Sequence, residues 1–265
     1  LRSAQKNLTQ VPIHHATRKN RVALILAPMW APYVAPYGIA RLAGMARHAG
    51  FETQCWDINI RCHDATKGEL WNYLWDWKWA NPLMYESEIH PVILPTLEQC
   101  IEEIVAFNPT VVGFTFYYTN NKCTTWLIKQ LKQRLPGIKI LSGGPQSTQA
   151  KIEDADLIDH YVQGEGELLF SQLLESIENN ELQMPRVLVH DKSIRIDLDS
   201  LPIPDYRDFD IDLYTFKGVA SELSRGCIAK CQFCSETTFW RYRGRLAEAV
   251  LDEVEYNYKT FGIQS

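Results

Sequence analysis

Short apolar runs alternate along the chain with segments in which apolar residues recur at helical spacing. Between the first two runs, Ile39, Leu42 and Ala46 fall at i, i+3 and i+7 on one helix face, and Gly50 ends that helix. The runs themselves are too short for buried helices and are rich in strand-forming residues. The pattern therefore predicts five strands, at residues 21–27, 51–58, 110–116, 138–142 and 160–163.

Helical periodicity marks the segments that join the later strands. Three further helices are predicted around Leu97–Val105, Leu127–Leu135 and Leu169–Ile177, and Pro136 with Gly137 ends the second of them. Strands that alternate with helices are parallel strands joined by crossovers. The predicted fold class is therefore α/β, with a doubly wound five-stranded parallel sheet of the flavodoxin-like kind.

An insertion at residues 59–96 separates the second and third strands and is rich in tryptophan. Trp71, Trp75 and Trp79 are spaced at i, i+4 and i+8, so they are expected to share one helix face. Packing in the core or at an interface is the ordinary role of such a face. A lid over a large flat ligand is the alternative role.

The pattern changes after the last predicted helix. Alternating apolar residues at 186–198 predict a small hairpin, and 199–215, with two prolines and five aspartates, has the composition of a linker. The last segment is expected to open a second domain with a strand, a loop and a helix. The apolar face of that helix would hold Leu246, Val250, Leu251, Val254 and Tyr258.

These features predict four parts of the chain. They are an N-terminal extension at 1–20, a first domain at 21–180, the hairpin and linker at 181–215, and the start of a second domain at 216–265.

Composition and charge exclude several classes of protein. Of the 265 residues, 46% are hydrophobic and 22% are charged, which excludes a wholly disordered or collagen-like chain. The formal net charge of −5 argues against a nucleic acid as partner. No apolar run reaches the roughly 18 residues of a membrane-spanning helix, and the first twenty residues carry no signal-peptide pattern. We therefore expect a cytoplasmic protein without a membrane span.

Three of the seven cysteines crowd into eight residues. Cys227, Cys231 and Cys234 have the spacing C-x3-C-x2-C directly after a predicted strand. Thiolates bind soft metals and iron–sulfur clusters. A structural zinc site usually takes four ligands in two separated pairs, so three thiolates favour a four-iron cluster with one iron open to a substrate. A zinc loop completed by a distant cysteine is the alternative.

The cysteine loop resembles the cluster loop of the radical S-adenosylmethionine superfamily. The segments at 224–227 and 239–245 resemble in particular those members that carry an N-terminal cobalamin-binding domain. The resemblance implies a [4Fe–4S] cluster on the three cysteines, with S-adenosyl-L-methionine bound at the open iron beside Phe233 and Ser235. It also implies cleavage to a 5′-deoxyadenosyl radical with an electron from a donor such as a ferredoxin or a flavodoxin.

The N-terminal half resembles the cobalamin-binding half of that family over about 21–177. A proline-rich first loop, Val-Gly-Phe-Thr at 112–115, Gly-Gly-Pro at 143–145 and Gly-Glu-Gly-Glu at 164–167 occur in the family's order. The last motif is a poor phosphate cradle, because its two carboxylates would repel an anion. The resemblance implies cobalamin in contact with Met29, Trp30, Tyr37, Gly38, Thr115, Tyr117, Tyr118, Thr119, Asn120, Ser142, Gly143, Gly144, Pro145, Gln146, Gln163, Gly164, Glu165 and Gly166.

The D-x-H-x-x-G element, which supplies a histidine ligand to cobalt in cobalamin mutases, is absent from the sequence. We therefore expect cobalamin to bind without a histidine ligand from this domain. A side chain among Thr115, Tyr117 and Tyr118, a water molecule or nothing would face the lower side of the cobalt. Packing at the strand end is the alternative role of these three residues.

The resemblance places the radical chemistry in a partial β/α barrel, and a full barrel needs roughly 200 residues or more. Only about 50 residues follow the linker. We therefore expect the later elements that bind S-adenosyl-L-methionine and substrate to lie outside this sequence, and the chain alone to be incompetent in turnover.

The function that the resemblance favours is methyl transfer from methylcobalamin to an unactivated carbon of a small-molecule or lipid-like substrate. Cyclisation or rearrangement with cobalamin as an electron carrier is one alternative. A non-catalytic cobalamin-binding module with a structural metal loop is another. No catalytic residue is assigned.

Overall fold

The computed structural model describes residues 18–72, 74, 76–147, 151–152, 154–180, 184–191, 193–229, 231–234 and 240–262. Its centre is a parallel sheet with the strand order β2-β1-β3-β4-β5-β6. The strands are β1 (Arg21–Leu26), β2 (Glu52–Asp57), β3 (Val111–Thr115), β4 (Lys139–Gly143), β5 (His160–Gln163) and β6 (Val187–Val189). The doubly wound α/β fold is confirmed, with six strands where the sequence predicts five.

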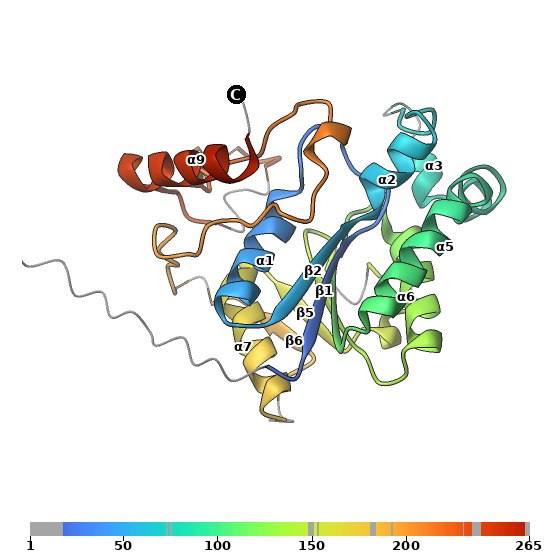
Figure 1. Ribbon diagram of the computed structural model, residues 1–265, viewed down its shortest axis with the longest axis horizontal. Helices are drawn as coiled ribbons and strands as arrows, with labels where there is room; N and C mark the ends of the chain where they lie inside the picture. The colour runs from blue at the N-terminus through green and yellow to red at the C-terminus, as the bar shows by residue number, and fades with distance from the viewer. Residues whose placement is uncertain are drawn as a thin grey trace, which may run out of the picture.

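Helices cover both faces of the sheet (Figure 1). One face carries α1 (Tyr37–His48) and α7 (Gly166–Glu178), and the other carries α5 (His90–Phe107) and α6 (Asn121–Arg134). Each face buries its own apolar cluster against these helices. The insertion adds α2 (Ile58–Ala65), α3 (Trp77–Ala80), α4 (Pro82–Met84) and the π-helix η2 (Tyr85–Ile89). Short 3-10 turns are η3 (Ala155–Leu157) and η4 (Ile211–Leu213).

Helix ends follow the punctuation of the sequence. Gly50, directly after α1 and its cap, has φ +86°, a conformation that glycine adopts without steric cost. Asn108 caps α5 in the left-handed region with φ +51°. Pro95 lies inside α5, so the helix begins earlier than the apolar periodicity from Leu97 alone predicts.

The predicted hairpin at 186–198 does not form. Val187–Val189 pairs parallel with β5, and the main chain of His190 donates to the Gln163 carbonyl at 2.9 Å. Ile196 and Leu198 are buried but make no strand pairs. The alternation does not mark a return strand, because Val189 and Ile194 are 62% and 51% exposed whereas Ile196 and Leu198 turn inward.

The tryptophans of the insertion pack in the core, but not on one helix. Trp71 precedes α3 without helical structure, whereas Trp79 lies in α3. Both are buried, with ring centroids 5.2 Å apart in an edge arrangement. The packing interpretation is confirmed for these two residues, and the shared helix face is wrong. Trp75 lies outside the described residues.

The proline-rich and aspartate-rich segment at 199–215 is packed along α1. The Asp205 main chain donates to the Ala40 carbonyl at 2.8 Å, and Tyr206 is fully buried. A Cβ at Gly44 of α1 would lie only 2.3 Å from the Ile203 carbonyl oxygen, so a glycine lets the two backbones touch. The composition of this segment predicts a linker, but in the structure the segment packs closely against α1. The domain boundary placed there stays a prediction.

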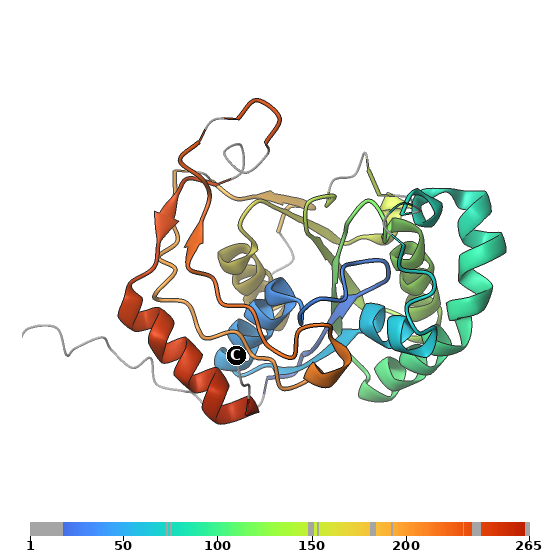
Figure 2. The ribbon, with the colours of Figure 1, turned by 90° about the horizontal axis from the view of Figure 1, so that it is seen from above.

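The last described part holds a second, two-stranded sheet and a helix (Figure 2). β7 (Ser224–Arg225) pairs antiparallel with β8 (Arg243–Gly244), and α9 (Ala247–Phe261) follows. The sequence predicts the strand, loop and helix, and the structure adds the return strand β8.

The apolar face predicted for α9 points to solvent. Leu246, just before the helix, and Leu251 are each 65% exposed, whereas the Glu253 side chain is fully buried against the body of the protein. Glu253 accepts from Arg245 at 2.7 Å and lies 3.6 Å from the Arg41 guanidinium. A buried ionic contact therefore decides which face of α9 is turned inward. Among the helices that the structure describes, none has both the length and the apolarity of a bilayer-spanning segment.

A buried carboxyl at the end of β2 makes stability depend on pH. Asp57 accepts from the Ile60 main chain at 2.9 Å and from the Tyr214 hydroxyl at 2.7 Å. Burial raises its pKa from 3.8 to about 6, although these hydrogen bonds oppose the shift. The folded state therefore holds the proton more tightly than the unfolded state. This contribution to stability is fully present below pH 4 and is lost as the pH rises to 6.

We expect Asp57→Asn to remove this pH dependence, because the amide keeps an acceptor for Ile60 and never ionises. Relative to wild type, the variant should gain about 3 kcal/mol of unfolding free energy between pH 4 and pH 7. Urea unfolding at four pH values in this range measures the difference, and every other titrating group is common to both proteins. Parallel pH profiles for the two proteins would contradict the assignment.

Candidate cobalamin-binding cavity

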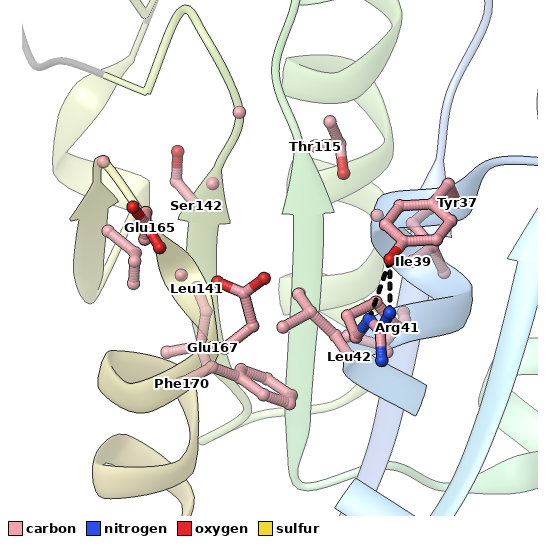
Figure 3. A pocket seen from close by; sticks show the side chains of 18 of the residues that line it. Tyr37, Ile39, Arg41, Leu42, Thr115, Leu141, Ser142, Glu165, Glu167 and Phe170 are labelled. Carbon is pink, nitrogen blue, oxygen red and sulfur yellow. Dashed lines mark hydrogen bonds between the residues drawn. The ribbon is translucent and has the colours of Figure 1, made fainter. Parts of the chain in front are cut away.

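A cavity of about 490 Å³ lies between the sheet, α1 and α7. Figure 3 shows Glu167 and Phe170 from α7 and Tyr37 and Leu42 from α1 at opposite sides of the cavity, on the same face of the sheet. The cavity adjoins β1 and β3, where the strand order reverses. This switch point is where doubly wound sheets bind their ligands.

Glycine residues, which have no side chain, leave room for the cavity on one face of the sheet. Successive residues of a strand point to opposite faces, so Gly143 shares the face of Leu141, toward α1 and α7. An added Cβ at Gly143 would meet no atom within 4 Å, whereas one at Gly113 of β3 would lie 2.8 Å from the Leu24 side chain. Space for a ligand is therefore left open at Gly143 and partly filled by Leu24 beside Gly113.

The first residue after β4 must be glycine. Gly144 has φ +92°, and its added Cβ would lie 2.8 Å from the Phe116 carbonyl oxygen. Next to it, Asn120 is fully buried and closes the loop after β3, because it accepts from the Tyr117 main chain at 2.8 Å and donates to the Thr115 carbonyl at 2.9 Å. The rim of the cavity is thus held by backbone contacts.

Aromatic residues form the upper rim. The Tyr117 ring lines the cavity and stacks on the Trp30 ring at a centroid distance of 3.8 Å and an interplanar angle of 13°. The Trp30 main chain is fixed by Asn59, which accepts from its N–H at 2.7 Å. Burial raises the pKa of Tyr117 to about 12, so its hydroxyl is protonated at neutral pH and can donate a hydrogen bond.

Charged side chains of α1, the start of α7 and the C-terminal segment line one wall of the cavity, and each of them is paired. Tyr37 donates to Glu222 at 3.1 Å and accepts from Arg41. Burial raises the pKa of Tyr37, although Arg41 opposes the shift, so the hydroxyl is neutral. Arg225 meets the carboxylates of Glu165 and Glu167 at 3.0 and 2.6 Å. Burial alone lowers the pKa of Arg225, but its ion pairs outweigh burial and hold the pKa above its ordinary value.

Ten of the residues that the resemblance implies for cobalamin line this cavity. They are Tyr37, Gly38, Thr115, Tyr117, Ser142, Gly143, Gly144, Gly164, Glu165 and Gly166. The other eight lie around it without lining it: Met29, Trp30, Tyr118, Thr119, Asn120, Pro145, Gln146 and Gln163. The Thr119 hydroxyl donates to the Met29 carbonyl at 2.7 Å and so links the loop after β3 to the loop after β1.

Sequence reasoning missed the floor of the cavity and the wall contributed by the C-terminal part. The floor is formed by Leu24, Leu42, Gly113, Phe114, Leu141, Val162 and Phe170. The far wall includes Arg41, Glu167, Glu222, Ser224, Arg225, Gly226 and Trp240. Strand alternation could have identified the floor, because Leu24, Leu141 and Val162 share one sheet face.

The three cysteines of the motif lie on one loop between β7 and β8. Cys227 and Cys231 are exposed, Cys234 is half-buried, and all three are free thiols. The Cys227 sulfur accepts from the Ala229 main chain at 3.4 Å, and Phe233 is 92% exposed. Within the described ranges, no three histidine, cysteine or acidic side chains are grouped as metal ligands. Ser235 and Phe239 lie outside the described residues.

Comparison with known proteins supports a corrinoid ligand. Residues 83–174 match the family of B12 binding domains. The solved structure of OxsB, a cobalamin-dependent S-adenosylmethionine radical enzyme, covers 92% of this chain with a TM-score of 0.57. This chain covers 33% of that one, and at 14% sequence identity the likeness shows the fold alone.

Curated relatives are enzymes of two descriptions. An uncharacterized methyltransferase of Pyrococcus horikoshii is 27% identical over 194 residues, which are 64% of this chain and 41% of the relative. An anaerobic magnesium-protoporphyrin IX monomethyl ester cyclase of Synechocystis is 27% identical over 202 residues, 68% of this chain and 40% of the relative. The chain thus spans about two fifths of the length of these relatives.

Proposed function

We propose that this chain, which carries a B12-binding domain and has enzymes among its relatives, belongs to a cobalamin-dependent radical S-adenosylmethionine enzyme that transfers a methyl group to an unactivated carbon. The observation that carries the proposal is the glycine-lined cavity at the switch point, whose far wall is the base of the cysteine loop. The ligand site therefore adjoins the base of the loop that carries the three free thiols.

The cavity residues fit a corrinoid. The open space at Gly143 accepts a flat apolar group, and Leu24, Leu141 and Val162 supply an apolar floor. The neutral hydroxyl of Tyr117 at the rim can hydrogen-bond an amide group of a corrinoid. A methyl group bound to cobalt is the chemistry that cobalamin supplies when bound. The protein's own share is to position that group and to exclude water.

The cysteine loop supplies three thiol groups, which are the type of ligand that iron–sulfur clusters take. Cys227, Cys231 and Cys234 would hold the cluster, and when bound it supplies the electron that cleaves S-adenosyl-L-methionine. The remaining cysteines are buried in the two core clusters and are poorly placed as ligands: Cys55, Cys62, Cys100 and Cys123. Burial raises the pKa of each of these four thiols, which keeps them protonated.

Anaerobic purification with hydroxocobalamin and reconstitution with iron and sulfide tests both halves of the proposal. We expect one corrinoid and about four irons and four sulfides per chain. The triple variant Cys227→Ala/Cys231→Ala/Cys234→Ala should lose the iron and keep the corrinoid, because the cavity is untouched. One zinc per chain in place of iron would favour a non-catalytic module, and a colourless protein with both cofactors would contradict the proposal.

A radical cyclase is the second candidate, because several of the similar proteins are cyclases. In that case cobalamin would carry electrons rather than a methyl group. Deuterium from methyl-labelled S-adenosyl-L-methionine in the product supports methyl transfer, and its absence from a ring-closed product supports cyclisation. The substrate and a one-electron donor such as a ferredoxin or flavodoxin belong to the proposal in either case.

A further inference from the structure

The cysteine loop is the tip of a hairpin whose base is closed by backbone contacts. Arg225 of β7 pairs with Arg243 of β8, so the two residues are direct cross-strand neighbours. Gly226, which immediately precedes Cys227, has φ +78°, and a Cβ there would lie 2.8 Å from the Arg241 main chain. The backbones of Gly226 and Arg241 therefore lie in close contact directly before Cys227, and glycine is the residue that permits this contact.

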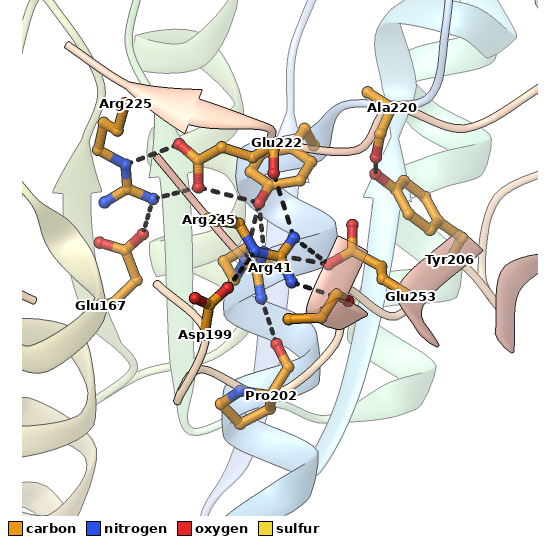
Figure 4. A network of polar contacts seen from close by, with 12 residues as sticks. Arg41, Glu167, Asp199, Pro202, Tyr206, Ala220, Glu222, Arg225, Arg245 and Glu253 are labelled. Carbon is orange, nitrogen blue, oxygen red and sulfur yellow. Dashed lines mark hydrogen bonds and ion pairs between the residues drawn. The ribbon is translucent and has the colours of Figure 1, made fainter. Parts of the chain in front are cut away.

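Both cross-strand arginines reach across to α7. Arg225 donates to Glu165 at 3.0 Å and to Glu167 at 2.6 Å, and Arg243 also donates to Glu165. The remaining donors of Arg225 meet both oxygens of Glu222 at 2.7 and 2.9 Å. Figure 4 shows Arg225 between Glu167 and Glu222. The base of the hairpin is thus pinned to the N-terminus of α7.

The location of the carboxylates fits this pinning. Glu165 occupies the N-cap position of α7 and Glu167 stands in its first turn, where the helix dipole stabilises negative charge. Arg225, Glu165 and Glu167 are at most 11% exposed, so each charge needs its partner. Arg225 makes four hydrogen bonds to three carboxylates from three separate nitrogens, whereas a lysine ammonium has only three donors on one atom. The Gly-Glu-Gly-Glu motif therefore serves as an anchor for arginine.

The pinned residues are also the wall of the cavity. Glu165 and Glu167 line it from α7, and Ser224, Arg225 and Gly226 line it from the hairpin. Trp240, at the other end of the cysteine loop, lines it as well. A ligand in the cavity therefore touches the chain on both sides of the three cysteines.

We propose that Arg225 is a positioning residue that couples occupancy of the cavity to the arrangement of the cysteine loop through its ion pairs with Glu165 and Glu167. Filling the cavity fixes the two carboxylates and the arginine between them, and thereby the entry of the chain into the loop. Because such coupling is reciprocal, an ordered cysteine loop should in turn raise the affinity of the cavity for the corrinoid. This inference rests on the proposed function for the identity of the ligand.

Thiol alkylation reads the loop without any catalytic turnover. In the cluster-free full chain, iodoacetamide should modify Cys227, Cys231 and Cys234, while the four buried cysteines serve as internal controls. Mass spectrometry gives the rate at each cysteine with and without cyanocobalamin. For wild type we expect cyanocobalamin to slow alkylation of the loop by about fivefold or more.

Arg225→Lys separates coupling from simple coverage by the ligand. We expect the variant still to bind cyanocobalamin, but the ligand should slow alkylation of the loop little or not at all. Because coupling is reciprocal, the affinity for cyanocobalamin should fall by the same factor as the slowing of alkylation. A variant that retains the full slowing would overturn the proposal, because the ligand would then be covering the cysteines directly. Arg134→Gln, which removes an exposed arginine paired with Glu102 far from the cavity, is the matched control and should behave as wild type.

A charge-balanced variant keeps the test decisive if Arg225→Lys does not fold. Arg225→Gln/Glu167→Gln removes one charge of each sign and leaves Glu165 paired with Arg243. We expect faster alkylation of Cys227 in this variant than in wild type even without cyanocobalamin, and equal rates would refute the positioning role. Failure of wild type to bind any corrinoid would instead reject the proposed function.

Discussion

Replacing Gly143 by valine should weaken corrinoid binding by roughly 5- to 150-fold, the equivalent of about 1–3 kcal/mol of overpacking. The added side chain points to the cavity face of β4, where no protein atom lies within 4 Å of the new Cβ. Valine also suits a strand. The fold should therefore keep its stability while the ligand loses its space, and a spectroscopic titration with hydroxocobalamin measures the loss.

Two further glycines give the controls for this result. Gly244→Ala lies in β8, where the new Cβ would make only an ordinary contact with the Tyr242 hydroxyl at 3.9 Å, and it should leave binding unchanged. Gly113→Ala should instead lower stability, since its Cβ would meet the Leu24 side chain at 2.8 Å. Tight binding by a stable Gly143→Val protein would show that the ligand lies elsewhere.

Removing the guanidinium of Arg41 should destabilise the protein by about 3–5 kcal/mol. Its side chain is 2% exposed, donates to the Pro202 carbonyl and to the Tyr37 hydroxyl, and lies 3.6 Å from buried Glu253 (Figure 4). Arg41→Met leaves the Pro202 carbonyl and the Tyr37 hydroxyl without this donor. It also leaves Arg245 as the one described cation beside buried Glu253. The free energy of unfolding, from urea titration followed by circular dichroism, measures the effect.

An exposed ion pair provides the comparison of scale. Arg134 and Glu102 are both at least one third exposed, so Arg134→Gln should cost no more than about 1 kcal/mol. If the two arginine variants were equally stable, the contact between α1 and α9 would not be the ionic one described here. Selective loss of protease resistance in α9 of Arg41→Met would localise the damage to that helix.

The alternation of strands and helices predicts the fold well, because a buried parallel sheet leaves a simple periodic record. The pairing of the sixth strand escapes prediction, since Val187–Val189 falls in the first arm of the predicted hairpin but pairs parallel with β5. The inward face of α9 also escapes, because hydrophobicity ranks Leu251 above Glu253. The buried contacts of Glu253 with Arg245 and Arg41 reverse that ranking, and Arg41 lies too far from Glu253 in sequence for periodicity to detect the contact.

The candidate site divides in the same way. The glycine turns, such as Gly144, are visible in the sequence because glycine is the residue that a left-handed turn demands. Arg225, in contrast, is one arginine among several near the cysteines. Only the fold shows that it meets Glu165, 60 residues earlier in the chain. Local motifs thus indicate the edge of the sheet at which a ligand would bind. The cavity wall formed by residues far apart in sequence can be identified only from the structure.

The gap at Gly143 has a consequence for the whole molecule. The layer between β4 and the helices is open at this glycine, so a bound corrinoid would complete it. The cofactor would then be a structural part of the protein, and melting temperature would climb with corrinoid concentration according to the occupancy of the cavity. Supply of the vitamin would in that way govern how long the protein lasts as well as what it can do.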